Sequence, residues 1–272
     1  MPDTIPDAVR DRLAVGVRVY SKDETHLQNF TLPQVAKMVA ALRGKVGKIF
    51  LSVWQAEDQP HSDFGGRRGT YVALSARYVD DPFVDVNMVD GDLFVAALNQ
   101  TLALAHVEGF EYFMPLSASA YHLLTPRTIR GINMGLARGA LVVDVTSPDN
   151  PITLRGASSN TCAVYHAQSL MDIGGFDKRD TRPADFDVTK HIAGVGELLN
   201  ALVLGDMHGR RVLWVVVPDV VLGDVRDDDQ HRKKLREKER RAEAMLTENG
   251  YDWQSLQNAM MARPLLAETI RL

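Results

Sequence analysis

The stretch Asp92–Ser119, DLFVAALNQTLALAHVEGFEYFMPLSAS, decides the fold. Residues 92–107 predict a helix with an acidic start, and Phe110–Leu116 is a short apolar run typical of a buried strand. Ser117-Ala118-Ser119 follows directly at the carboxyl end of that strand. A helix that leads into a buried strand fits the repeating unit of an α/β sheet, in which crossover helices join the strands.

The same alternation of short apolar runs and longer helical segments extends in both directions from this stretch. Further strands are expected at Val15–Tyr20, Lys48–Trp54, Phe83–Val89, Ala140–Thr146, Cys162–Tyr165 and Arg211–Val217. Further helices are expected at Leu32–Leu42, Pro126–Arg138 and Asp187–Leu204. Thr31 is placed to cap the first of these helices and Gly44 to end it. Gln55–Gly69 is rich in residues that break helices and strands, and it predicts a loop.

The composition is that of an ordinary globular chain. Of the 272 residues, 45% are hydrophobic and 24% are charged, which is enough to build a large core. A net charge of -4 gives no general attraction to nucleic acid or anionic lipid. Cys162 is the only cysteine, so no disulfide can form within the chain. The sequence shows neither a signal peptide nor an apolar run of the ~18 residues that a membrane span needs, and a cytoplasmic setting is expected.

The last part of the sequence differs in character from the rest. Residues 224–243 are densely charged and include RKKLREKERR, in which Glu237 and Arg241 have the spacing of an ion pair across one helical turn. We therefore expect two parts, an α/β domain over residues 1–223 and a charged helical extension over residues 224–272. The extension fits either a solvated helix or a basic docking surface for a protein partner, a membrane or a second copy of the chain.

Three segments resemble family 2 glycosyltransferases in the order and separation that this family shows. Residues 97–105 and 108–113, ALNQTLALA and EGFEYF, resemble the helix and strand that lead to the metal motif of the family. Residues 162–177, which end in Gly-Gly-Phe-Asp, resemble its acceptor-side segment. Residues 184–188, ADFDV, are similar to the acidic start of the helix that carries the catalytic base. The resemblance covers residues 14–217.

This resemblance implies the A-type glycosyltransferase fold, in which a Rossmann-like nucleotide half is joined to an acceptor half around a mixed central sheet flanked by helices. It implies transfer of a sugar from a nucleotide-diphosphate sugar to an acceptor. Asp185 would be the base that takes the proton of the acceptor hydroxyl, with Asp187 two residues on. Both carboxylates would equally suit a helix N-terminus without a catalytic role. The donor, the acceptor and the stereochemistry do not follow from the residues.

The resemblance also implies which residues contact the donor. Asp23 and Glu24 occupy the place of an Asn-Glu pair near the nucleotide base. After the second strand the family has two aspartates that face the base and ribose, whereas this chain has Trp54 and, further on, Asp58. Stacking on Trp54 with a shifted carboxylate is the corresponding hypothesis for base recognition. The donor-side set is completed by Asn99, Ser117 and Ser119.

Ser117-Ala118-Ser119 stands where the family places Asp-x-Asp, the two carboxylates that meet the divalent ion. Magnesium and manganese prefer carboxylate and phosphate oxygens, and neutral hydroxyls contribute little toward holding either ion. We therefore assign no metal ligand, and the motif does not support a Mn or Mg cofactor. Transfer without a cation would need basic side chains on the leaving diphosphate. The candidates lie beside glycines that allow close approach to phosphate, and they are Arg67, Arg68 and Arg155.

Two functions remain open at this point. The chain is either a glycosyltransferase with a weak or absent metal requirement, or a non-catalytic relative that binds or scaffolds through its charged C-terminal segment. The intact Gly-Gly-Phe-Asp and Ala-Asp-Phe-Asp segments favour the enzyme, and the missing Asp-x-Asp favours the binding protein. A nucleotidyltransferase has less support, because no phosphate loop of the GxxxxGK[ST] kind is present.

Overall fold

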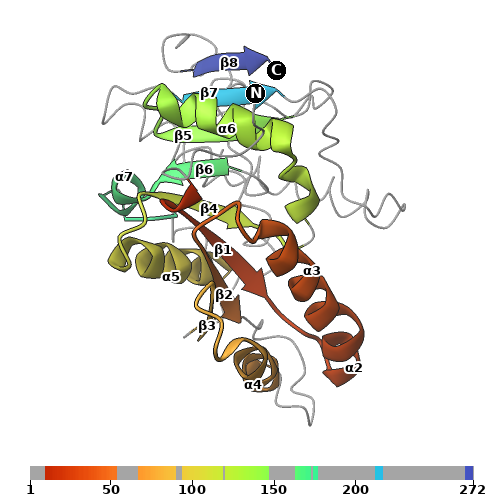
Figure 1. Ribbon diagram of the computed structural model, residues 1–272. Helices are drawn as coiled ribbons and strands as arrows, with labels where there is room; N and C mark the ends of the chain where they lie inside the picture. Colours follow the sequence, from red (N-terminus) through yellow and green to blue (C-terminus); the bar gives the residue numbers. More distant parts are fainter. Residues whose placement is uncertain are drawn as a thin grey trace, which may run out of the picture.

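A computed structural model of the protein describes residues 10–53, 67–89, 94–118, 120–146, 163–172, 174–176, 212–216 and 267–271. Within these residues, eight strands form one sheet in the order β3-β2-β1-β4-β6-β5-β7-β8 (Figure 1). In chain order the strands are β1 (Leu13–Val19), β2 (Lys48–Val53), β3 (Val84–Met88), β4 (Tyr112–Leu116), β5 (Val142–Thr146), β6 (Ala163–His166), β7 (Val212–Val216) and β8 (Ala267–Arg271).

Among these strands, all but β6 run in the same direction. β1 pairs in parallel with β2 on one side and with β4 on the other, and β3 continues the sheet beyond β2. β6 is antiparallel to both of its neighbours, β4 and β5. On the far side, β5, β7 and β8 are again parallel to one another. The predicted mixed sheet is confirmed, and β1 is the strand from which the chain builds the sheet first toward β3 and then toward β4.

Helices cover both faces of this sheet. The described helices are α2 (Glu24–His26), α3 (Leu32–Leu42), α4 (Arg67–Tyr78), α5 (Phe94–Val107), α6 (Pro126–Ala137) and α7 (Ala167–Asp172), with a π-turn η1 (Leu27–Thr31) and a short 3-10 turn η2 (Tyr121–Leu123). Figure 1 shows α3 and α5 on opposite sides of β1 and β2, and α6 packs on β5 and β7. Parallel strands need such crossover connections, because a tight hairpin cannot join them.

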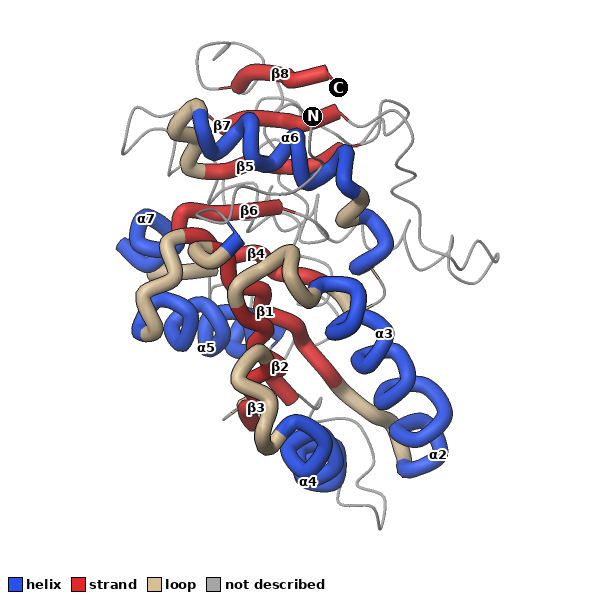
Figure 2. The backbone as a smooth tube through the Cα atoms, in the orientation of Figure 1, coloured by secondary structure: helices blue, strands red, loops and turns tan. Residues whose placement is uncertain are grey.

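The alternation of side chains along the strands divides the core into two layers. The layer under α3 takes its β1 members from the odd positions, which are Leu13, Val15, Val17 and Val19. The layer under α5 contains Ala14 of β1, Phe50 of β2 and Phe113 of β4. In Figure 2 the strands accordingly run through the middle of the described chain with helices outside them. A sheet buried on both faces produces continuous apolar strands, which is the pattern that the sequence shows.

The helix Leu32–Leu42 is confirmed, but its predicted cap is wrong. Gly44 follows the helix with a φ of 77°, a left-handed conformation that glycine adopts easily at helix ends. Thr31 has helical backbone angles, φ -65° and ψ -53°, and its side chain makes no capping hydrogen bond. The reason is the π-turn η1, which carries the helical backbone through Thr31 into α3 without a break.

Two further segments differ from the prediction. The predicted loop Gln55–Gly69 does not extend to its expected end, because α4 begins at Arg67 and takes Arg67 to Gly69 into its first turn. Within the expected helical extension 224–272, Ala267–Arg271 is the strand β8, which pairs in parallel with β7. The other residues of that extension and the predicted helix Asp187–Leu204 lie outside the described residues.

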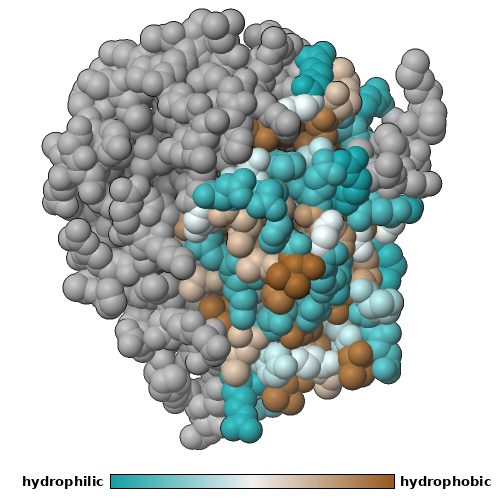
Figure 3. Space-filling model, turned by 90° about the vertical axis from the view of Figure 1, so that its left-hand side faces the viewer, coloured by the Kyte–Doolittle hydropathy of each residue, from teal (hydrophilic) through white to brown (hydrophobic). Residues whose placement is uncertain are grey.

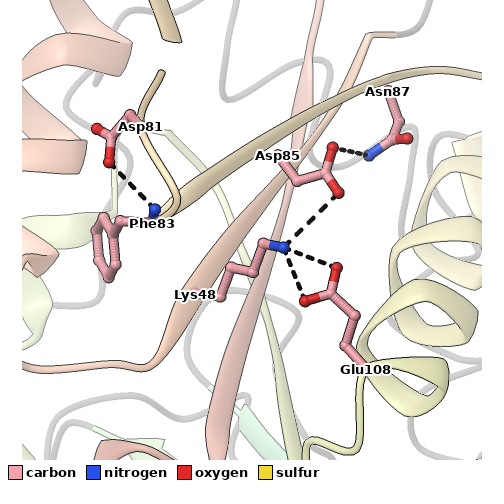
Figure 4. Close-up of polar contacts among 6 residues, drawn as sticks. All are labelled: Lys48, Asp81, Phe83, Asp85, Asn87 and Glu108. Carbon is pink, nitrogen blue, oxygen red and sulfur yellow. Dashed lines mark hydrogen bonds and ion pairs between the residues drawn. The ribbon is translucent and has the colours of Figure 1, made fainter. Parts of the chain in front are cut away.

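Charged side chains tie together the edge of the sheet at which β2 and β3 begin (Figure 4). Lys48, at the start of β2, places its Nζ 2.7 Å from both carboxylate oxygens of Glu108, just after α5. The same Nζ lies 3.9 Å from Oδ2 of Asp85 in β3, and Asn87 donates a hydrogen bond to Asp85 at 3.1 Å. These contacts join α5 to two strands at the edge opposite to the one where β1 and β4 end.

Gly16 sets how closely α5 and β4 pack against β1. A Cβ atom at Gly16 would lie 2.5 Å from Cζ of Phe113 and 2.5 Å from Oγ1 of Thr101. Both side chains are completely buried, and the Thr101 hydroxyl donates to the Leu98 carbonyl at 2.9 Å. Neither neighbour can therefore move aside easily, and only glycine fits at this position.

We predict that Gly16→Ala lowers the free energy of unfolding by about 3 kcal/mol, because the added methyl overpacks the core between β1 and α5. Gly44→Ala is the matched control: its Cβ meets no atom within 4 Å, but φ is +77°. Backbone strain alone costs about 1 kcal/mol there. Urea unfolding of both variants measures the difference, and a loss no larger at Gly16 than at Gly44 would contradict the packing argument.

A second prediction concerns acid stability. A hydrogen bond from Arg43 lowers the pKa of Asp81 below its ordinary 3.8, and the Phe83 backbone N–H acts in the same direction at 3.1 Å. A lowered pKa stabilises the folded protein above the ordinary value, and this contribution is lost as the pH falls through the folded pKa. Asp81→Asn removes the titrating group. We therefore expect the stability difference between wild type and variant to be constant from neutral pH to about pH 5 and to shrink below about pH 4.

Urea midpoints at a series of pH values test this expectation, with the slope of each transition checked for constancy. A difference that stays unchanged into the acid range would show that Asp81 does not contribute to acid unfolding.

Candidate functional site

Polar residues follow β1 and β4 at the point where these neighbouring strands end. In parallel sheets with helices on both faces, ligands bind outside the carboxyl ends of the strands, where the order of the strands reverses. Here that point lies between β1 and β4. Residues 20–24 follow β1, and Ser117 and Ala118 follow β4. The structure therefore places three of the predicted donor residues, Asp23, Glu24 and Ser117, after the two strands that meet at this edge.

A groove of about 400 Å³ lies between the segment after β1 and the start of α4. It is lined by Glu24, Leu27, Gln28, Arg68, Gly69, Val72 and Ala73. The structure thus brings together Glu24 and Arg68, which the sequence predicted from separate segments. Apolar walls with one carboxylate and one guanidinium are the lining that a small ligand with a polar edge needs.

Asp23 has a structural partner at the start of α2. Its Oδ1 accepts a hydrogen bond from the backbone N–H of His26 at 2.7 Å, so this carboxylate caps the short helix. The cap fixes the direction in which the chain leaves β1. Glu24, the next residue, is then the one of the predicted Asp23-Glu24 pair that lines the groove.

An aromatic cluster that the sequence analysis missed lies in the same segment. The ring of His26 stacks on Tyr20 at 6.0 Å between centroids and packs against Phe30 at 5.0 Å. Tyr20 and Phe30 are 40% and 47% exposed, which is high for large apolar rings. The signal that could have found them is the presence of three ring side chains in one short segment directly after a predicted strand.

The turn after β4 presents hydroxyl and backbone groups instead of carboxylates. The Ala120 N–H donates to the Ser117 carbonyl at 2.8 Å and closes the turn. Mn²⁺ and Mg²⁺ require carboxylate oxygens for tight binding, and neither Ser117 nor Ala118 supplies one. Among the described residues, no three His, Cys, Asp or Glu side chains form a cluster that could hold a metal. The described part of this edge does not fit a divalent cation, and no step is assigned to one.

Asn99 holds the backbone of the Gly-Gly-Phe turn. Its Nδ2 donates to the Phe176 carbonyl at 2.9 Å, and its Oδ1 accepts from the Phe176 N–H at 2.8 Å. Gly175 has a φ of 80°, and a Cβ there would lie 2.5 Å from Oδ1 of Asn99. The amide of Asn99 therefore links α5 to the turn after α7, and its role in donor binding stays a prediction.

Several predicted site residues lie outside the part of the chain that the structure describes. Arg67 begins α4, but only its backbone is described, whereas Arg68 is described in full and exposed. The sequence predictions that the structure does not reach concern Trp54, Asp58, Ser119, Arg155, Asp185 and Asp187. Phe176, held by Asn99, is the last described residue before the two predicted catalytic aspartates.

On the face in Figure 3, the coloured residues show hydrophobic groups dispersed among hydrophilic ones. Across the described residues, no helix combines the length and the apolar character that crossing a membrane requires.

The fold of the chain is similar to that of a solved structure. No family model matches the chain, and none of the curated proteins is similar to it in sequence. The mannosyltransferase PcManGT from Pyrobaculum calidifontis, solved in complex with GDP-Man and Mn²⁺, superposes with a TM-score of 0.59 at 16% identity, over 94% of this chain and 70% of that chain. The predicted A-type glycosyltransferase fold is therefore confirmed, with its mixed sheet flanked by helices.

Two further structures are less similar to the chain. A 4-diphosphocytidyl-2C-methyl-D-erythritol synthase has a TM-score of 0.42 at 14% identity, over 83% of this chain and 99% of that chain. A protein from Desulfovibrio desulfuricans G20, assigned as a nucleotide-diphospho-sugar transferase, has a TM-score of 0.42 at 12% identity, over 85% of this chain and 97% of that chain.

The Asn99 contact leads to a third prediction. Asn99→Asp keeps the shape of the side chain but loses the donor to the Phe176 carbonyl and places a carboxylate against it. We expect the free energy of unfolding to fall by about 1–3 kcal/mol, the usual cost of leaving a partly buried polar group without its partner. Gln168→Ala, an exposed change in α7, is the control and should stay within about 0.5 kcal/mol of wild type. Equal urea midpoints for wild type and Asn99→Asp would show that the hydrogen bonds between Asn99 and Phe176 do not stabilise the fold.

Proposed function

We propose that this protein transfers a sugar from a nucleotide-diphosphate sugar to an acceptor, and that the donor binds where β1 and β4 end. The observation that carries the proposal is the groove between the segment after β1 and the start of α4, lined by Glu24 and Arg68, in a fold that PcManGT shares over 94% of the chain. Proteins that share one fold can have many different activities, so the similarity to PcManGT supports a transferase only by analogy. The polar residues of the groove add chemical support, because they can contact a nucleotide and its phosphates.

The groove supplies one part of donor recognition. Glu24 offers a carboxylate that can accept hydrogen bonds from a base or a ribose hydroxyl, and Leu27 and Val72 offer apolar surface for a ring. Arg68, in the first turn of α4, adds a guanidinium at the positive end of the helix, where phosphate oxygens are favoured. Since PcManGT was solved with GDP-Man, guanosine and uridine diphosphate sugars are the donors to test first.

The proposed reaction is a single displacement at the anomeric carbon. The acceptor oxygen attacks that carbon and loses its proton to a carboxylate, for which Asp185 is our first choice and Asp187 the second. The bond from the anomeric carbon to the diphosphate oxygen breaks, and the diphosphate leaves with the electron pair. Because the turn after β4 carries no carboxylate pair for a cation, we assign the neutralisation of the leaving group to basic side chains, with Arg68 first and with Arg67 and Arg155 as further candidates.

A second function is favoured by one specific observation. Ser117 and Ala118, at the end of β4, lack the carboxylates that would bind a metal-bridged diphosphate. A protein that binds a nucleotide sugar without turning it over would have the same residues there, and its charged C-terminal segment would then engage a partner.

The fourth prediction separates the two functions. Calorimetric titration with guanosine and uridine diphosphate sugars, with Mn²⁺ or with a chelator, should give one preferred donor and equal affinity under both conditions. Glu24→Gln and Arg68→Ala should each weaken binding about tenfold, as expected for the loss of one charged contact. Asp185→Asn should bind the donor as wild type does and release no nucleoside diphosphate.

Failure of every nucleotide sugar to bind would overturn the proposal. Binding without release of nucleoside diphosphate by the wild type in the presence of a broad acceptor mixture would favour the binding protein. A strict dependence of binding on Mn²⁺ would show that carboxylates elsewhere in the chain hold a cation.

A further inference from the structure

One hydrogen bond joins the two walls of the switch point. Nε2 of Gln34, in the first turn of α3, donates to the Ala118 carbonyl in the turn after β4 at 3.0 Å. The two residues are 84 positions apart in the chain. α3 follows β1, so this contact ties the helix that leaves one strand to the loop that leaves its neighbour. The sequence contains no signal for this contact of Gln34.

The turn that Gln34 holds is fixed on its other side by the core. The Ala120 N–H bonds to the Ser117 carbonyl at 2.8 Å, and Ala120 is only 5% exposed. Ala118 packs against the hydrophobic cluster under α3. One end of the turn is buried, and the hydrogen bond from Gln34 holds the carbonyl of Ala118 in place.

The π-turn η1 determines the direction in which the Gln34 side chain points. The Leu32 N–H bonds to the Leu27 carbonyl, five residues back, so the helix makes one wider turn before α3 starts. Such turns shift the register of the residues that follow, and they occur frequently at functional sites. Without the extra residue of this turn, the residues of α3 would be rotated by about 100° about the helix axis, and the side chain at position 34 would point away from β4.

Hydrogen bonds of buried hydroxyl groups hold this π-turn against the segment after β1. The Thr31 hydroxyl lies 2.9 Å from the Ser21 hydroxyl, 3.3 Å from the Tyr20 carbonyl and 3.2 Å from Nδ1 of His26. Ser21 and Thr31 are 3% and 5% exposed. Buried hydroxyls that are fully bonded hold a unique geometry, because breaking one bond leaves a buried polar group without a partner. The segment after β1, the π-turn and Gln34 therefore form one connected support.

We infer that Gln34 is a positioning residue for the diphosphate of the donor: by holding the Ser117–Ala120 turn against α3, it fixes the distance between the walls that follow β1 and β4. This inference rests on the proposed function. The ligand class is a nucleoside diphosphate, whose phosphates would face the Ser117 hydroxyl and the backbone of the turn. In a site without a cation, the protein groups that donate hydrogen bonds to the phosphates must be in place before the ligand binds. Each group that has to be ordered on binding reduces the affinity.

Lys45 provides a matched control. It also donates from the α3 side to a backbone carbonyl near η2, that of Leu124, at 3.3 Å. Lys45 follows the other end of α3, so its contact joins the end of this helix to the residue after η2 without touching Ser117 or Ala118. Comparable losses of stability are expected from Gln34→Ala and Lys45→Met, since each removes one hydrogen bond from a side chain to the backbone.

The fifth prediction is that the two variants differ in ligand binding. Gln34→Ala and Gln34→Glu, which keeps the size but loses the donor, should weaken the affinity for the preferred nucleoside diphosphate about tenfold by calorimetry. In turnover assays, KM for the donor should rise while KM for the acceptor stays constant. Hydrogen exchange of the peptide that contains residues 117–123 should accelerate in the free Gln34 variants only. Lys45→Met should match wild type in all three measurements.

The outcomes distinguish this inference from the proposed function. If wild type binds a nucleoside diphosphate and Gln34→Ala binds it with equal affinity, the positioning role is overturned and the proposed function stands. Equal weakening by Lys45→Met would overturn it as well, because the effect would then be one of general stability. If wild type binds no nucleoside diphosphate, the proposed function fails and the positioning role with it.

Discussion

Parallel pairing of β1 with both β2 and β4 is the constraint on which the rest of the structure depends. It gives three neighbouring strands a common direction, so that their carboxyl ends lie along one edge of the sheet. Gly16 allows this arrangement to be tight, because Phe113 and Thr101 occupy the space that a side chain would need. The polar residues that follow β1 and β4 lie at this edge of the sheet. The ion pairs of Lys48 lie at the opposite edge, where β2 begins.

In the function that we propose, the site at this edge meets the charge of a diphosphate without a metal bound by carboxylates at residues 117 and 118. Arg68, the start of α4 and the turn after β4 are the described groups that we propose for this role. The turn is held by Gln34, which is held in turn by the π-turn and its buried hydroxyls. Such prior ordering matters because electrostatic stabilisation depends on groups that need not reorganise during the reaction.

Strands and long helices could be predicted because their signals are local. β2 and α3 were found from apolar runs and helical periodicity, since both are buried on their predicted faces. The start of α4 reads as a loop, because its Arg-Arg-Gly segment lacks an apolar stripe. The role of Asn99 depends on Phe176, 77 residues away, and that of Gln34 on Ala118. These contacts join residues that lie far apart in the chain, and a single sequence contains no signal that pairs them.

We propose that a nucleoside diphosphate binds between the segments that follow β1 and β4 without a divalent ion. The decisive measurement is a crystal structure of the protein with the preferred nucleoside diphosphate, grown with Mn²⁺ present. We predict phosphate density near Ser117 and Arg68, no Mn²⁺ between phosphates and protein, and an unchanged contact between Gln34 and Ala118. Phosphates bound at another edge of the sheet, or bound here through a Mn²⁺ ion held by protein carboxylates, would contradict the account.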